Sequence, residues 1–167
     1  MTQQYVVPEF DSANKVLLAR NAYNEEFGER VAFVAASRDL HGLTCDRQEF
    51  LGQQGRLDRP AALRRIGLGG TVQAGLDPCA ALQAPYEAQH VYFVLGQGQD
   101  RQQAIDLATR YRDPDQAEHA RRAVDRFWDR VLGTVTIETP EPAIDVLLHR
   151  WLLYQALSCR TWRRSAP

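Results

Sequence analysis

Residues suited to chemistry fall in two clusters of this sequence. The first is Asp46-Arg47-Gln48-Glu49, where two carboxyl groups lie three positions apart with an arginine between them. Paired carboxyl groups carry out general acid–base catalysis, and glycoside cleavage uses such a pair, or a single acid together with phosphate. In a β-strand these two side chains would point to opposite faces of the sheet. The residues alone therefore favour a polar cluster around Arg47 that braces a loop.

The second cluster is Arg160, Trp162 and Arg164, close to the end of the sequence, with Arg163 beside them. An indole stacks on the face of a sugar ring, and a guanidinium donates paired hydrogen bonds to hydroxyl groups or phosphate. The same residues also fit the basic last turn of a helix, where positive charge interacts favourably with the helix dipole. A sugar–phosphate subsite and a basic helix end both stay open.

Other kinds of site have weaker support. Gly67–Gly70 and Gly96–Gly98 begin a dinucleotide-binding pattern, but Val72 and Arg101 stand where its third glycine belongs. We therefore interpret these glycines as turns, and the three widely spaced cysteines as reduced thiols. The histidines lack the spacing of metal ligands, so we expect no metal; they are His41, His90, His119 and His149.

Composition describes an ordinary globular protein. The chain has 167 residues, of which 44% are hydrophobic and 25% charged, and its net charge is -1. A charge this close to zero gives no field that attracts nucleic acid or an anionic membrane. The sequence has neither an apolar run of about 18 residues nor the features of a signal peptide, so we expect a cytoplasmic domain.

The first part of the chain has the pattern of a β-sandwich. Short runs rich in valine, leucine and phenylalanine predict strands at Lys15–Asn21, Glu29–Ala36 and Gln89–Gly96. Turn residues separate these runs. We therefore predict a β-sandwich domain over residues 1–99.

Helical spacing replaces this pattern after residue 99. Asp100 caps a predicted helix that runs to about Tyr111, and Asp113-Pro114 starts a second helix that ends at Gly133. A short strand is expected at Thr134–Glu138, so residues 100–138 form a helical linker with a short strand. The order of elements makes the fold α+β and mainly β.

A third helix is predicted over residues 139–167, with its start at Thr139-Pro140. It is apolar on most sides, so it needs burial on most sides. The sequence offers nothing downstream to provide that burial. We therefore expect the chain to be a fragment of a larger protein, with self-pairing into a homodimer through residues 140–160 as a way to cover the helix.

Four stretches carry a resemblance to a known family. They are Arg150–Ala166 (RWLLYQALSCRTWRRSA), Asn21–Gly28 running into Arg30–Phe33, Asp46–Gly52, and Gly75–Gln83. Together they resemble the glycoside hydrolase family 94 phosphorylases, formerly glycosyltransferase family 36. Within that family they are most similar to the phosphorylase-like C-terminal region of bacterial cyclic β-1,2-glucan synthases. The resemblance covers roughly residues 14–166.

The resemblance implies a fold and a reaction. The fold is a supersandwich of the galactose-mutarotase-like type, followed by linker helices and an (α/α)6 barrel, of which this chain holds only the first helix. The reaction is inverting: phosphate attacks the anomeric carbon while one carboxylic acid protonates the leaving oxygen. The general acid is expected beyond Pro167, so this chain has no catalytic residue. Inorganic phosphate is a co-substrate of the parent enzyme, and no cofactor is implied.

The resemblance also assigns expectations to individual residues. It makes Asp46, Arg47 and Glu49 candidates for a saccharide-facing loop, and it places Arg160, Trp162 and Arg164 at the active-site end of the barrel. Arg163 departs from the family pattern, which has a small residue there. The expected partners are a β-glucan and the barrel of the same polypeptide, in a parent enzyme compatible with anchoring in the bacterial inner membrane.

Three functional hypotheses stay open. In the first, the chain is an inactive sandwich domain that packs on the barrel and helps shape the β-glucan site. In the second, it is a stand-alone carbohydrate-binding module, which requires an exposed aromatic platform on the sandwich. In the third, it is purely structural.

Overall fold

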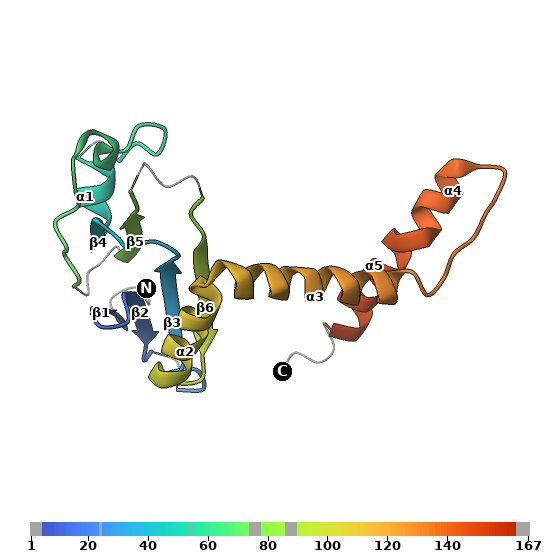
Figure 1. Ribbon diagram of the computed structural model, residues 1–167, viewed down its shortest axis with the longest axis horizontal. Coiled ribbons are helices and arrows are strands. Elements are labelled where there is room, and N and C mark those ends of the chain that lie inside the picture. Colours follow the sequence, from blue (N-terminus) through green and yellow to red (C-terminus); the bar gives the residue numbers. More distant parts are fainter. Residues whose placement is uncertain (1–4, 24, 54, 74–77, 86–89, 163–167) are drawn as a thin grey trace. The chain divides into compact units, whose positions relative to one another are not determined.

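The computed structural model describes residues 5–23, 25–53, 55–73, 78–85 and 90–162. The chain divides into two compact units, Met1–Ala117 and Glu118–Pro167. The first unit contains an antiparallel four-stranded sheet with the order β1-β2-β3-β6 and a separate two-stranded sheet, β4-β5 (Figure 1). The strands are β1 (Val6–Asp11), β2 (Val16–Asn21), β3 (Val31–Ala36), β4 (Gly42–Asp46), β5 (Pro78–Gln83) and β6 (Phe93–Gly98).

The predicted strands are confirmed, with one shift. β2 and β3 lie within the predicted runs, whereas β6 begins at Phe93 and extends through Gly98 instead of ending at Gly96. Two glycines inside β6 explain why it continues. A Cβ on Gly96 would lie 2.6 Å from the ring of Phe33, and one on Gly98 would lie 2.5 Å from the backbone nitrogen of Ala104. Both positions therefore need glycine because neighbours pack closely, not because the strand ends there.

Helix α2 (Arg101–Arg112) covers one face of the four-stranded sheet (Figure 1). Its predicted cap is confirmed, since the Asp100 carboxylate accepts a hydrogen bond of 2.8 Å from the backbone N–H of Gln103. The core of this unit lies between helix and sheet. It consists of Val16, Leu18, Val31, Phe33, Ala35, Ala104, Ile105 and Ala108.

The opposite face of the sheet is also apolar and is covered only in part, since Leu17 is buried and Leu95 is not. It forms the floor of a groove of about 330 Å³, whose far wall includes Cys45 and Cys79 of the two-stranded sheet. Leu95 lies on this face and is 81% exposed. Two of the floor positions, Leu17 and Val34, pair across the strands, and Val34 in turn pairs with Leu95. We call this surface the open face.

The second unit begins within α3 (Pro114–Leu132), the second predicted helix. Its cap and its end are confirmed: Asp113 accepts a hydrogen bond from the N–H of Gln116, and Gly133 follows the last turn. The short strand expected at 134–138 is wrong, because these residues form an irregular segment.

The terminal helical segment starts later than predicted. Glu141 occupies the N-cap position and Pro142 the first turn, while Thr139 hydrogen-bonds Glu141 in the turn before the helix. The segment consists of α4 (Pro142–Val146), the π-helical turn η3 (Leu147–Trp151), α5 (Leu152–Ala156) and the π-helical turn η4 (Leu157–Trp162). Tyr154 reaches Trp128 of α3, with ring centroids 5.5 Å apart. Several large apolar side chains stay exposed even so, including Val146, Leu147, Trp151 and Leu152.

Candidate functional site

The Asp46–Gly52 segment lies at the junction between β4 and helix α1 (Arg47–Leu51). Asp46 is the N-cap: its carboxylate accepts hydrogen bonds from the backbone N–H groups of Gln48, at 2.8 Å, and Glu49, at 3.3 Å. A carboxylate is well suited to this position because it satisfies amides that have no partner within the helix. The carboxylate of Asp46 therefore serves the backbone of its own helix.

Glu49 ties three segments together. Its carboxylate accepts hydrogen bonds from the Thr44 hydroxyl, at 2.6 Å, and from the backbone N–H of Gly69, at 2.5 Å. The Arg65 guanidinium lies 3.7 Å away. Thr44 is fully buried, and the side chain of Glu49 is only 14% exposed. This carboxylate braces the 67–71 loop against β4.

These contacts correct the sequence-based geometry of the cluster. The segment is a capped helix rather than a strand, and the contacts described here that hold the loop are made by Glu49. Arg47 is an exposed residue in the first turn of α1. The structure thus assigns backbone-holding contacts to both carboxylates and does not bring them together as an acid–base pair.

The rest of the segment also has a structural role. Leu51 is buried, and Gly52 ends the helix with a φ of +82°, a conformation that favours glycine. A Cβ on Gly52 would lie 2.9 Å from that of Ala61 in the 3₁₀ turn η2 (Ala61–Arg64). Opposite the brace, Gly70 N–H donates to Leu43 and Cys45 N–H donates to Thr71. The segment therefore holds β4, α1 and the 67–71 loop together.

The second candidate cluster is described only in part. The backbone of Arg160 and Trp162 belongs to the η4 turn, but their side chains lie outside the described part of the structure. Arg164 lies outside the described residues altogether. Their role as a sugar–phosphate subsite stays a prediction.

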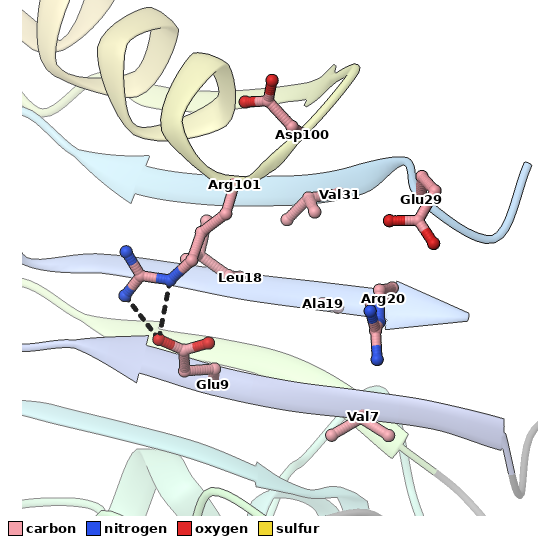
Figure 2. Close-up of a pocket in the computed structure, with 9 residues that line it drawn as sticks. All are labelled: Val7, Glu9, Leu18, Ala19, Arg20, Glu29, Val31, Asp100 and Arg101. Carbon is pink, nitrogen blue, oxygen red and sulfur yellow. Dashed lines mark hydrogen bonds and ion pairs between the residues drawn. The ribbon is translucent and has the colours of Figure 1, made fainter. Parts of the chain in front are cut away.

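A hollow in the first unit lies where α2 leaves the sheet uncovered (Figure 2). It measures about 470 Å³. Its lining consists of Val7, Glu9, Leu18, Ala19, Arg20, Glu29, Val31, Asp100 and Arg101. Its carboxyl groups are Glu9, Glu29 and Asp100, of which Glu9 is paired with Arg101 and Asp100 caps α2.

An arginine crosses this hollow and joins α2 to β1. Figure 2 shows Arg101 pointing from the start of the helix toward Glu9, which it contacts at 3.1 Å through Nε and 2.5 Å through Nη2. The same Nη2 lies 2.8 Å from Asp11. The hydrogen bond from the Asn14 N–H, together with those from Arg101, lowers the pKa of Asp11. Sequence reasoning missed this network because about ninety residues separate its partners.

Among the described residues, the Cys45 thiol is not activated and the acidic groups form no metal site. Burial, with a smaller effect of the neighbouring Cys79 thiol, raises the pKa of Cys45 to about 11, so this thiol is not activated. Among the described residues, no group of three or more histidine, cysteine, aspartate or glutamate side chains is placed to hold a metal ion. Within the same residues, no helix is long and apolar enough to cross a membrane.

Comparison with known proteins places these observations in a family. Residues 1–114 match the family described as glycosyl hydrolase 94, supersandwich domain. The chain is 36% identical to the cyclic beta-(1,2)-glucan synthase NdvB of Rhizobium meliloti (strain 1021), across 99% of this chain and 6% of that protein. It is 25% identical to the N,N'-diacetylchitobiose phosphorylase of Vibrio furnissii, across 80% of this chain and 17% of the relative. It is 24% identical to the enzyme of the same name from Vibrio proteolyticus, across 86% of this chain and 18% of that relative. The chain therefore spans less than a fifth of each relative.

Proposed function

Because this chain belongs to the glycosyl hydrolase 94 supersandwich domain family, we propose that it is a non-catalytic part of a glycosyltransferase or glycoside phosphorylase that acts on a β-glucan. The observation that carries this proposal is how the Asp46–Glu49 carboxylates are used. Asp46 caps α1, and Glu49 holds Thr44 and Gly69. A general acid donates its proton to the leaving oxygen, whereas both of these carboxylates accept hydrogen bonds from groups of this domain.

The open face supports a place within a larger assembly of strands. A sandwich buries the inner faces of two sheets against each other. Here α2 covers one face of the four-stranded sheet, and Leu95 on the other face is 81% exposed. Burying a leucine side chain contributes about 1.5–3 kcal/mol, so an open row of this kind favours contact with further polypeptide. The short share of each relative's length agrees with this proposal.

The chemistry of the whole enzyme follows from the family as part of this proposal. We infer an inverting reaction, with inorganic phosphate as attacking group and a carboxylic acid supplied by an (α/α)6 barrel elsewhere in the polypeptide. The terminal helical segment corresponds to the first barrel helix. Arg160, Trp162 and Arg164 lie at its end and are our candidates for contact with the glucan or phosphate.

A turnover assay tests the absence of catalysis. The chain is incubated with β-1,2-glucan and phosphate, and glucose 1-phosphate is measured. A diacetylchitobiose phosphorylase with its own disaccharide serves as the positive control. We expect no release above the background without protein, since positioning and acid catalysis together supply several orders of magnitude in rate. Release that depends on this chain would refute the proposal.

A single substitution tests the packing role. Leu95→Asp should change the stability of this chain by less than about 0.5 kcal/mol, because the side chain is largely in water. In the longer polypeptide that carries the domain, the same substitution should lower soluble yield and thermal stability, since it places a charge in the sheet interface. Equal behaviour in both proteins would contradict the packing role.

Exposed aromatic side chains on the first unit favour the alternative function, a carbohydrate-binding module. Such a module requires exposed aromatic rings on which sugar rings can stack. Tyr5, Tyr23 and Phe27 are all more than 40% exposed on the first unit.

A further inference from the structure

Three aromatic side chains are exposed at one end of the four-stranded sheet. Tyr5 directly precedes β1, and Tyr23 and Phe27 lie in the connection between β2 and β3. Their exposed fractions are 41%, 58% and 44%. The rings of Tyr5 and Tyr23 lie 5.0 Å apart at their centroids with a tilt of 41°. Neighbouring aromatic rings that are exposed to solvent provide an apolar surface with polar edges, which is typical of binding sites.

A hollow of about 320 Å³ opens at this end of the sheet, and Phe27 is the one of these three residues that lines it. Its floor is formed by small or apolar residues of the sheet, Val6, Ala19 and Ala32. Its sides are formed by Phe27, Arg20, Asn21, Arg30 and Gln97. Val6 and Asn21 are direct partners across the strands, and they lie next to Tyr5 and near Tyr23 in the sequence. The aromatic pair and the hollow therefore occupy the same end of the sheet.

The side chains around the hollow have hydrogen-bonding capacity to offer a ligand. Among the described residues, the side chains of Arg20 and Gln97 have no hydrogen-bond or ion-pair partner. The Arg30 guanidinium lies over the Phe27 ring, 5.9 Å from its centre. Asn21 uses its Oδ1 to accept from the N–H of Tyr23, which leaves its amide donors available.

Polarity along the open face separates this end from the rest of the sheet. The row through Leu17, Val34 and Leu95 is apolar, as a packing surface requires. Toward the hollow, Gln97 and then Asn21 and Arg30 replace apolar residues. Unpaired polar side chains of this kind are not buried in sheet interfaces, because each would lose its water without a partner. The hollow shares Val6, Ala19 and Ala32 with the apolar groove, but its polar rim favours contact with solvent or a polar ligand.

We propose that this hollow, with the Tyr5–Tyr23 pair beside it, binds a saccharide ring. The C–H face of a hexopyranose matches the Phe27 ring and the small apolar floor, and its equatorial hydroxyl groups match the amide and guanidinium donors on the sides. The Tyr5–Tyr23 pair provides a second stacking surface for a neighbouring sugar unit. The chemistry of the hollow argues for a saccharide by itself, while the choice of a β-glucan as the probe rests on the proposed function.

Nuclear magnetic resonance titration of the full chain tests this proposal. Linear β-1,2-glucooligosaccharides are added to ¹⁵N-labelled protein, and cellooligosaccharides are added in a parallel series to distinguish the linkages. We expect saturable shifts, with a dissociation constant in the millimolar range, at the amides of residues 21–30 and 97. Shifts confined to other parts of the chain would overturn the proposal, as would the absence of saturable shifts up to about 10 mM.

Matched variants separate a stacking role from a structural one. Phe27→Leu and Tyr23→Leu remove a ring and should weaken binding about fivefold or more, whereas Phe27→Tyr and Tyr23→Phe keep the ring and should bind within about twofold of the original chain. Tyr92→Leu is the control, because Tyr92 is 45% exposed but lies at the opposite end of β3, beside Ser37.

Preserved amide dispersion in each variant shows that it is folded. Equal affinity of the leucine variants and the original chain would refute the stacking role. A failure of saccharide binding leaves the turnover and packing tests of the proposed function unaffected, so the two ideas can fail separately.

Discussion

The brace formed by Glu49 can be tested by removing its carboxylate. Glu49→Ala leaves the Thr44 hydroxyl without the acceptor that lies 2.6 Å away, in a residue with no exposed surface. An unsatisfied buried hydroxyl destabilises the folded state by about 1–3 kcal/mol. Gly69 is exposed, so its N–H regains water and adds less, and the exposed Arg65 pair adds little. We expect the free energy of unfolding to fall by about 2–3 kcal/mol.

Urea unfolding followed by circular dichroism measures this change. Tryptophan fluorescence is unsuitable for it, because Trp128, Trp151 and Trp162 all lie in the second unit. Glu49→Gln keeps an acceptor and should cost about half as much, and Gln48→Ala on the exposed side of α1 is the matched control. A double-mutant cycle with Thr44→Val should give a coupling energy of about 1 kcal/mol. A stability within about 0.5 kcal/mol of the original chain for Glu49→Ala would refute the brace.

Three further predictions follow from the thiols, from α3 and from the terminal segment. Cys159 is exposed while Cys45 is buried with a pKa of about 11, so a thiol reagent at pH 8 should modify one site rapidly, and Cys159→Ser should abolish that fast phase. Hydrogen bonds from Arg121 and then Arg122 lower the pKa of Glu118 from 4.5 to about 2. The ionised Glu118 carboxylate therefore stabilises α3 above pH 4.5, and this stabilisation is lost as the pH falls through about 2. Glu118→Gln should reduce the loss of helicity, measured by circular dichroism, between pH 4.5 and 2. The exposed apolar residues of 142–162 should drive self-association, so light scattering should give a dimer for this chain and a monomer for one ending at Glu138; two monomers would contradict self-pairing.

Helix boundaries were predictable from the sequence because their causes are local. The caps at Asp100 and Asp113 each act on a backbone N–H three residues away, so the sequence pattern contains the whole interaction. The start of the last helix was misplaced because the segment offers two prolines near a hydroxyl, Pro140 and Pro142. Only the folded chain shows that the later proline takes the first turn.

Strands were harder to predict because their partners are distant. β1 was not predicted; it lies at the edge of the sheet, where its Pro8 is tolerated because no further strand needs the missing N–H. The end of β6 was placed too early because Gly96 and Gly98 resemble a turn. Their absent side chains make room for Phe33 and for the start of α2, and neither contact is visible in a single strand.

The candidate site shows the same division between local and distant causes. The sequence identified Asp46–Glu49 as a cluster, but the function of Glu49 depends on Gly69, twenty residues away. The aromatic end of the sheet was missed for a similar reason: Tyr5 and Tyr23 come together only through the pairing of β1 with β2.

The two faces of the four-stranded sheet explain why such an assignment is difficult. β2 and β3 are nearly continuous apolar runs, so both of their faces are apolar over most of their length. Hydrophobic spacing therefore cannot say which face packs on α2. The change of polarity along the open face carries the missing information. Leu95 requires a partner, whereas Gln97, two residues later on the same face, requires water or a ligand. One strand therefore carries both the apolar row that we propose packs on further polypeptide and the polar end that we propose binds a sugar.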